Sequence, residues 1–294
     1  MRGSHPERSL ERLVAEAVRP RTGEVLVAAV SGGPDSVALA ALLAHGAAPA
    51  GAHVVVAHVN HGARPGSDQD EAVVLALGST LGLRVVTRRL EPGPAGEARL
   101  RRGRYAALGE IARNVGARRI FTAHQAEDQT ETVLLALFRG TGPAGLAGMP
   151  PVRRLGAGLS LERPLLAATK AQLTAYALAR RLPFALDPTN ESPGYRRNAV
   201  RRALGDLRGS FPGLDAAVAR WAAIARQERA GAEPALIRRD LRAELAAALG
   251  DARDLTFERL DAAARSVAER RPGRHFLRPG VELVVRPRRQ GPRA

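Results

Sequence analysis

One stretch near the N-terminus constrains the fold more than any other. From Val25 to Leu39 an apolar β-branched run leads into Ser-Gly-Gly-Pro-Asp-Ser and then into a second apolar pattern. The first run predicts a parallel strand buried on both faces, and the second predicts a helix that packs on the sheet. A helix N-terminus presents unpaired backbone N–H groups at the positive end of its dipole. The stretch therefore predicts a phosphate-binding turn between strand and helix.

The residues of this turn, Ser31 to Ser36, suit a bound anion. Gly32 and Gly33 let a phosphate approach the backbone without a Cβ in the way, and the two serines add hydroxyl donors. The spacing excludes a Walker A loop, which needs G-x-x-x-x-G-K-[ST], and it is not G-x-G-x-x-G either. The six residues resemble the signature of the PP-loop ATP pyrophosphatases, which implies cleavage of ATP between its α and β phosphates. The alternative is a tight turn without a ligand. Six matching residues between a predicted strand and a predicted helix make this alternative weaker.

Further apolar runs at 54–59, 83–87 and 119–122 alternate with helical patterns at intervals of about 30 residues. This alternation predicts an α/β fold with a doubly wound, mostly parallel sheet. Ligands of such sheets bind beyond the carboxyl ends of the strands, so His58, Asn60 and His61 are expected beside the phosphate turn. The Gly- and Pro-rich stretch from Gly142 to Gly158 predicts a loop over that site.

A domain boundary is predicted at Phe211-Pro212-Gly213. It divides the chain into a catalytic domain, 1–212, and a smaller, mainly helical C-terminal domain, 213–294. Two domains are also what a chain of 294 residues favours. The second domain is expected to hold Trp221 in its core, a strand at 281–285 and a basic tail.

Composition narrows the class of partner. The formal net charge is +16, from 45 basic and 29 acidic side chains, and it favours a polyanion, most plausibly nucleic acid. Compositional drift in a chain rich in Ala, Gly, Pro and Arg is the alternative. The absence of cysteine excludes disulfides, thiolate metal sites and thiol nucleophiles. With no apolar run long enough for a bilayer and no signal-peptide pattern, a soluble cytoplasmic protein without a membrane partner is expected.

Read in order, residues from about 20 to 215 resemble the tRNA(Ile)-lysidine synthetase family. The matching motifs are Ser31 to Ser36, His58-Val59-Asn60-His61-Gly62-x-Arg64, Ala123-His124-x-x-x-Asp128-Gln129-x-Glu131-Thr132, Arg139-Gly140-Thr141-Gly142, Arg163-Pro164-Leu165-Leu166, Asp187-x-Thr189-Asn190 and Arg197-Asn198-x-x-Arg201. Two departures are that Gln125 replaces a second His common in the family, and that the additional C-terminal domain of longer members is not found.

The resemblance implies an ATP-dependent ligase acting on the wobble cytidine of a CAU-anticodon tRNA(Ile). ATP adenylates the carbonyl oxygen at ring position two, and the ε-amine of L-lysine then displaces AMP to give lysidine. The change converts methionine-like specificity into isoleucine specificity. ATP with Mg²⁺ and a homodimer are further expectations from the family.

Site residues carry over on the same resemblance. The residues expected to bind ATP are Ser31, Gly32, Gly33, Pro34, Asp35, Ser36, His58 and Asn60. The expected catalytic residues are Asp35, His124, Asp128 and Arg139. Those expected to bind lysine or tRNA are Glu131, Arg197, Asn198 and Arg201. Asp35 and Asp128 are candidates either to hold Mg²⁺ or to orient and deprotonate the lysine ammonium, and Asp35 is the named magnesium ligand.

Three alternatives have different signatures. A PP-loop tRNA thiolase uses the same adenylation but needs cysteines, and this chain has none. Amidotransferase relatives such as GMP synthetase need an ammonia source, and no nucleophilic Cys is available to make one. A catalytically inactive RNA-binding relative would keep the basic surface, but the intact Ser31, Asp35 and Ser36 weigh against it.

Overall fold

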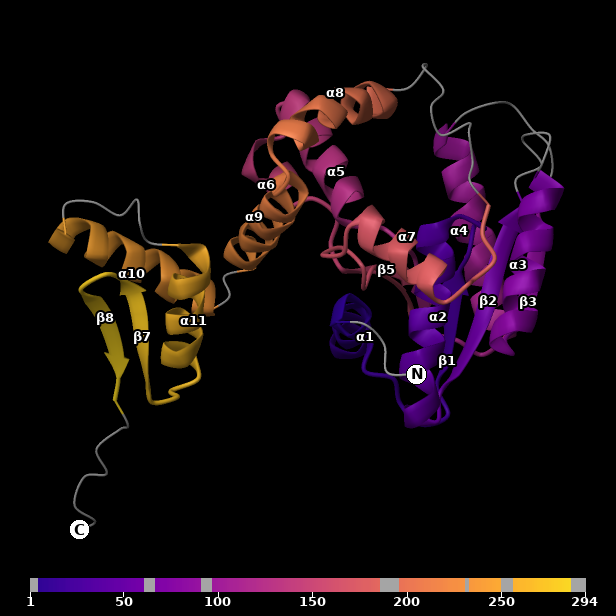
Figure 1. The fold of residues 1–294 in the computed structure, drawn as a ribbon, viewed down its shortest axis with the longest axis horizontal. Coiled ribbons are helices and arrows are strands. Elements are labelled where there is room, and N and C mark those ends of the chain that lie inside the picture. Colours follow the sequence, from indigo (N-terminus) through magenta and orange to yellow (C-terminus); the bar gives the residue numbers. More distant parts are fainter. Residues whose placement is uncertain are drawn as a thin grey trace, which may run out of the picture. The chain divides into compact units, whose positions relative to one another are not determined.

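The computed structural model describes residues 5–60, 67–90, 97–185, 196–230, 233–249 and 256–286. The chain divides into two compact units, Met1–Arg220 and Trp221–Ala294 (Figure 1). The division falls within α9, Leu214–Arg229, whereas the predicted boundary at Phe211-Pro212-Gly213 lies just before this helix.

Within the described part of the first unit, six strands form one sheet in the order β3-β2-β1-β4-β6-β5. All neighbours pair in parallel except β5, which runs antiparallel to β6 at the edge. This confirms the predicted α/β fold with a mostly parallel sheet. The strands are β1 Val25–Ala29, β2 His53–Asn60, β3 Arg84–Arg89, β4 Arg119–Phe121, β5 Val152–Gly156 and β6 Leu159–Glu162.

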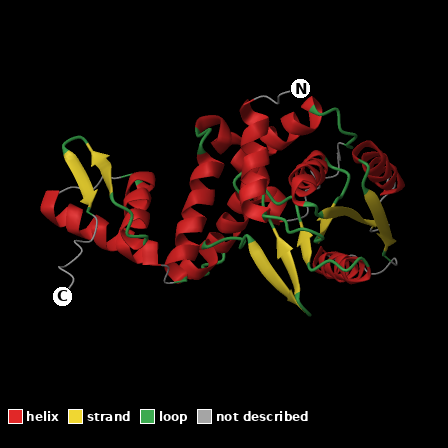
Figure 2. Ribbon diagram, turned by 90° about the horizontal axis from the view of Figure 1, so that it is seen from below, coloured by secondary structure: helices red, strands yellow, loops and turns green. Residues whose placement is uncertain are grey.

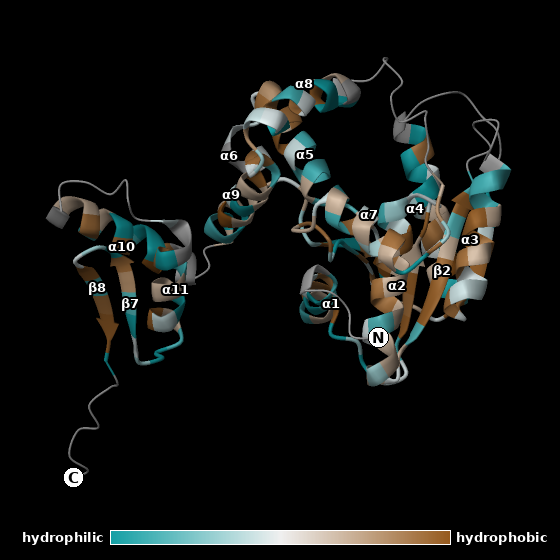
Figure 3. Cartoon of the chain, viewed as in Figure 1, coloured by the Kyte–Doolittle hydropathy of each residue, from teal (hydrophilic) through white to brown (hydrophobic). Residues whose placement is uncertain are grey.

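Helices cover both faces of this sheet (Figure 2). Leu26 and Ala28 of β1 belong to one apolar cluster, with α1, α2, α3 and α7, while Val27 between them faces a second cluster, with α4. Burial on both sides explains why β1 is continuously apolar, and Figure 3 shows the strands and α2 among the most hydrophobic parts of the unit. The helices are α1 His5–Val18, α2 Pro34–Ala47, α3 Ser67–Leu81, α4 Glu97–Asn114, α5 Ala126–Phe138, α6 Gly142–Leu146, α7 Lys170–Ala179 and α8 Arg196–Ser210, with a short 3₁₀ turn at Ala48–Ala50.

The expectation of a loop from Gly142 to Gly158 is wrong, because this stretch contains α6 and the edge strand β5. The buried Gln129 of α5 fastens it to the domain. Its side-chain amide donates to the Met149 carbonyl at 3.1 Å, and its Oε1 accepts from the Met149 N–H at 2.7 Å. This side-chain amide satisfies both backbone polar groups of Met149, between α6 and β5, and no local sequence pattern signals such a contact.

Gly148→Ala is expected to destabilise the first unit by roughly 2 kcal/mol. Gly148 has φ +61°, and an added Cβ would meet Gln129 Oε1 at 2.6 Å, which breaks the amide contact with Met149. Gly158→Ala is the matched control, since that glycine also has a positive φ, +74°, but has open space at the Cβ position. Urea unfolding of both variants measures the difference, and an equal loss for the two would contradict the role given to Gln129.

The described part of the second unit contains α10 Glu233–Leu249, α11 Phe257–Ala268 and an antiparallel hairpin of β7 Gly273–Arg278 and β8 Val281–Val285. Leu260, Ala263 and Leu277 form its apolar centre. The strand at β8 was expected, but β7 was not, because its sequence GRHFLR is largely polar. Trp221, expected in the core, is 51% exposed. No helix in the described ranges of either unit is long and apolar enough to cross a membrane.

Candidate active site

The phosphate turn after β1 is held in shape by its own two serines. Ser36 Oγ accepts from the Ser31 N–H at 3.1 Å and donates to the Gly33 carbonyl at 2.9 Å. Gly32 has φ +96°, and a Cβ there would come within 3.3 Å of the Asp70 carbonyl oxygen, so this position requires glycine. Gly33 caps α2 with no side-chain hydrogen bond, and Pro34 follows as the first helical residue. The first-turn N–H groups of α2 are therefore left without a side-chain cap and can receive an anion.

Asp35, in the first turn of α2, is a half-buried carboxylate whose enclosed Oδ1 has no hydrogen-bond partner among the described residues. Burial raises the pKa of Asp35 to about 6, and the nearby carboxylates of Asp128 and Glu127 raise it further, against the opposing charge of Lys170. A cation would stabilise the charged form of this partly dehydrated carboxylate beside the phosphate turn. No three His, Cys, Asp or Glu side chains in the described part of the chain form a ready-made metal cage. Mg²⁺ commonly binds through one or two carboxylates together with phosphate oxygens, so Asp35 fits this ion.

His58 and Asn60 lie at the carboxyl end of β2, beside the turn, as predicted. The Val30 carbonyl at the end of β1 accepts a hydrogen bond of 2.8 Å from His58 Nδ1, while the buried Nε2 has no partner among the described residues. The Asn60 amide donates to Glu71 at 3.1 Å and thereby ties the end of β2 to α3. The rest of this motif, His61 to Arg64, lies outside the described residues.

Gln125, which replaces the second histidine of the family pattern, caps α5. Its side chain accepts from the Glu127 N–H at 2.8 Å, and Asp128 Oδ2 accepts from the Gln125 N–H at 3.2 Å, which completes a capping box. The Gln125 side chain also lies beside Asp35 and lowers the pKa of that carboxyl. The cap thus connects α5 with the phosphate turn and brings Asp128 close to Asp35.

The predicted substrate residues Glu131, Arg197 and Arg201 form one ion-pair network between α5 and α8. Glu131 Oε2 lies 2.6 Å from Arg197 Nε, and Glu131 Oε1 lies 2.7 Å from Arg201 Nε. Arg197 also reaches Asp128 Oδ1 at 3.1 Å. Burial raises the pKa of Asp128, and the Arg197 charge opposes the shift. Glu131 is only 3% exposed in its side chain and has both oxygens occupied, so its first role is to hold α8 on α5.

His124 lies near these groups, with Nδ1 2.9 Å from Thr122 Oγ1 at the end of β4. Burial lowers the pKa of His124 to about 3, and the arginines around it lower it further. The imidazole is therefore neutral at physiological pH. The arginines that face it are Arg163, Arg104, Arg197 and Arg101.

An aromatic side chain lies among these cations. The guanidinium groups of Arg101, Arg104 and Arg153 lie 5.6, 5.4 and 5.2 Å from the centre of the Tyr105 ring. Arg163 is buried, and its Nη1 donates to the Pro150 carbonyl at 2.7 Å. Sequence reasoning quoted Arg163 in a motif but gave it no role, and it missed Arg153 because the edge strand β5 was read as a loop.

Two predicted residues are not brought into this cluster. Arg139 is the C-cap of α5 and is exposed, whereas Asp128 lies in the first turn, so about 16 Å of helix separates the two positions. Asn198 belongs to α8, but its side chain is outside the described part of the structure, as are Asp187, Thr189 and Asn190.

A known family and several curated proteins are similar to this chain in sequence. A family model described as a PP-loop domain matches residues 4–207. A tRNA(Ile)-lysidine synthase of Methylobacterium sp. (strain 4-46) is 48% identical over 182 residues, which cover 61% of this chain and 52% of that protein. Another, of Bordetella bronchiseptica, is 42% identical over 241 residues, which cover 78% of this chain and 67% of that protein. The chain thus spans about half the length of the first of these curated relatives.

Among solved structures, the U34-tRNA thiolase NcsA from Methanococcus maripaludis superposes with a TM-score of 0.65 at 15% identity. The match covers 75% of this chain and 80% of that one. At this identity the similarity concerns the fold alone. That structure carries a [4Fe-4S] cluster, whereas the present sequence has no cysteine.

Proposed function

We propose that this chain, which belongs to the PP-loop domain family and to the tRNA(Ile)-lysidine synthases within it, ligates L-lysine to the wobble cytidine of a CAU-anticodon tRNA(Ile). The observation that carries the proposal is the neighbourhood of the Ser31 to Ser36 turn and the Asp35–Asp128 pair. The turn suits a triphosphate, and the two carboxylates suit a cationic amine or a metal ion. The net charge of +16 suits tRNA as the partner.

In the first half-reaction, the cytosine carbonyl oxygen attacks the α phosphorus of ATP, and the bond between the α phosphorus and its bridging oxygen to the β phosphorus breaks. The departing pyrophosphate gains negative charge, which the N–H groups of the α2 N-terminus and the hydroxyls of Ser31 and Ser36 stabilise. Asp35 would hold the magnesium ion that accompanies ATP, and the ion would supply further neutralisation of the phosphate charge.

In the second half-reaction, the ε-amine of lysine attacks the activated ring carbon, and the bond from that carbon to the adenylated oxygen breaks to release AMP. The lysine ammonium must first lose a proton. We assign this step to Asp128, whose raised pKa makes it a better proton acceptor than an ordinary aspartate. Arg197 contacts both Asp128 and Glu131. An incoming ammonium can therefore replace Arg197 beside Asp128, and the Asp128 carboxylate still has a positively charged partner.

The remaining residues act around these steps. The neutral His124 can hydrogen-bond the cytidine without adding charge, and the arginines beside it suit the RNA backbone or the carboxylate of the lysine substrate. A cytoplasmic location and pairing into a homodimer belong to the same proposal, because both are expectations from the family.

The proposal is tested by incubating the chain with radiolabelled lysine, ATP and a CAU-anticodon tRNA(Ile) transcript. The label is expected to enter the RNA with one AMP released for each lysine. A transcript with uridine at the wobble position is the matched control and is expected to take up no label. Formation of ADP, or labelling of the uridine transcript, would contradict the proposal.

A further inference from the structure

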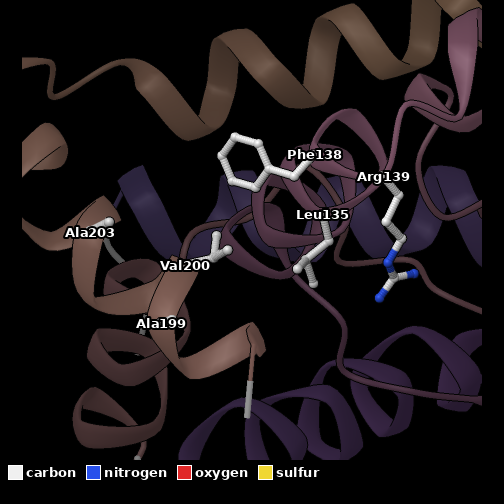
Figure 4. Close-up of a pocket in the computed structure, with 6 residues that line it drawn as sticks. All are labelled: Leu135, Phe138, Arg139, Ala199, Val200 and Ala203. Carbon is white, nitrogen blue, oxygen red and sulfur yellow. The ribbon is translucent and has the colours of Figure 1, made fainter.

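An apolar pocket of about 380 Å³ opens between α5 and α8 of the first unit, away from the phosphate turn (Figure 4). The ion pairs of Glu131 with Arg197 and Arg201 hold the two helices together beside it, so its walls are fixed. Its volume suits a small planar group. The residues that line it are Leu135, Phe138, Arg139, Ala199, Val200 and Ala203.

Phe138 is the distinctive member of this lining. It is 69% exposed, although aromatic residues make up only 3% of the chain, and Figure 4 shows its ring beside Leu135 at the pocket. An exposed aromatic ring over an apolar floor is the arrangement that RNA-binding proteins use to stack unpaired bases.

The positive charge at the pocket indicates which kind of ligand it binds. Arg139 lines the pocket. Its guanidinium group is exposed and makes no ion pair or hydrogen bond with a described residue. An unpaired cation in the lining of an apolar pocket favours a ligand that joins a flat apolar group to a phosphate, which a nucleotide does and an apolar peptide segment does not.

We infer that this pocket receives an unstacked base of the tRNA, with Phe138 against the face of the base and Arg139 on the adjoining phosphate. The inference rests on the proposed function, since it takes tRNA as the substrate. Phe138 lies about 15 Å along α5 from Asp128, so the base in the pocket is a neighbour of the target cytidine and not the target itself. Arg139 is thereby reassigned from catalysis to RNA binding.

Phe138→Ala is expected to weaken binding of an anticodon stem-loop RNA about tenfold, because base stacking on an aromatic ring is lost. Phe138→Tyr keeps the ring and is expected to bind within about twofold of the parent, and Phe138→Leu, which keeps only the bulk, falls between. Leu75→Ala removes a comparably exposed apolar side chain from α3 and is the control, with unchanged affinity. Fluorescence anisotropy measures the affinities, and KM for ATP is expected to stay the same in all four variants.

Stem-loops with one abasic loop nucleotide at a time identify the stacked base. One position is expected to cost the parent as much affinity as Phe138→Ala, and that variant should lose nothing more at the same position. Equal affinities of parent and Phe138→Ala, or additive losses at every position, overturn the inference. So does a change of oligomeric state in Phe138→Ala, seen by sedimentation, because the pocket would then contact a second copy of the chain. Lysine ligation by the parent, measured alongside, separates failure of the proposed function from failure of the pocket.

Discussion

Asp35→Asn is expected to lower the rate of pyrophosphate release about 100-fold or more while making the folded chain more stable at pH 7. The rate falls because the neutral amide no longer attracts the cation that accompanies ATP. The stability rises because a half-buried carboxylate with an enclosed, unpaired oxygen disfavours folding when it is charged.

The effect of Asp35→Asn on the free energy of unfolding depends on pH. Burial raises the pKa of Asp35 from 3.8 to about 6, so between these values the folded state binds more protons than the unfolded state. The contribution of Asp35 to stability is therefore fully present below about pH 4 and is lost as pH rises through 6, by up to about 3 kcal/mol. Urea unfolding of the parent and of Asp35→Asn at pH 4 and pH 7 measures this contribution. The variant should have a higher free energy of unfolding than the parent only at pH 7.

Asp128→Asn is the comparison for the activity. It should still release pyrophosphate in the presence of tRNA but transfer lysine slowly, because the proton acceptor for the ammonium is lost. Full lysine transfer by Asp128→Asn would remove that residue from catalysis. Normal pyrophosphate release by Asp35→Asn would remove Asp35 from the ATP site.

Glu131→Ala is expected to cost about 3 kcal/mol of unfolding free energy and to loosen α8 from α5. The substitution leaves Arg197 and Arg201 without the buried carboxylate that now pairs with both. Hydrogen exchange of the α8 amides should speed up, and lysine transfer should fall because Arg197 no longer has a fixed place beside Asp128.

Glu110→Ala is the matched control, since Glu110 also pairs with an arginine, Arg88, but both side chains are about half exposed. An exposed pair of this kind is worth less than about 1 kcal/mol. If the two variants lost equal stability, the Glu131 network would not be the anchor of α8.

The strands that are easiest to predict are those in which a run of apolar residues indicates that the strand is buried. β1 is continuously apolar and β2 is apolar from Val54 to Ala57 because helices cover both faces, and that signal is local. Three of the five residues of the edge strand β5 are arginine or glycine, and the strand pairs on one side only, so its register comes from β6. Such non-local pairing leaves little trace in the sequence of the strand itself.

The candidate site likewise has a part that is local in the sequence and a part that depends on contacts between distant residues. The turn at Ser31 to Ser36 is one local segment, and its geometry follows from its own residues. The partners of Glu131 come from positions 66 and 70 residues away in the chain, and only the fold reveals that they occupy both carboxylate oxygens. The position of Arg139 was within reach of sequence reasoning, because the predicted helix to Phe138 already separates it from Asp128 by three turns.

In the proposed reaction, ATP activates the wobble cytidine through the carbonyl oxygen of the base, and lysine then displaces AMP from the ring. The most direct measurement uses tRNA(Ile) with a heavy-oxygen label at that carbonyl, incubated with ATP, lysine and the parent chain, followed by mass spectrometry of the AMP. We expect the heavy oxygen to appear in the phosphate of AMP, in step with lysine incorporation. If the AMP carried no label while the RNA kept it and still gained lysine, the cytidine would not be activated through its carbonyl oxygen.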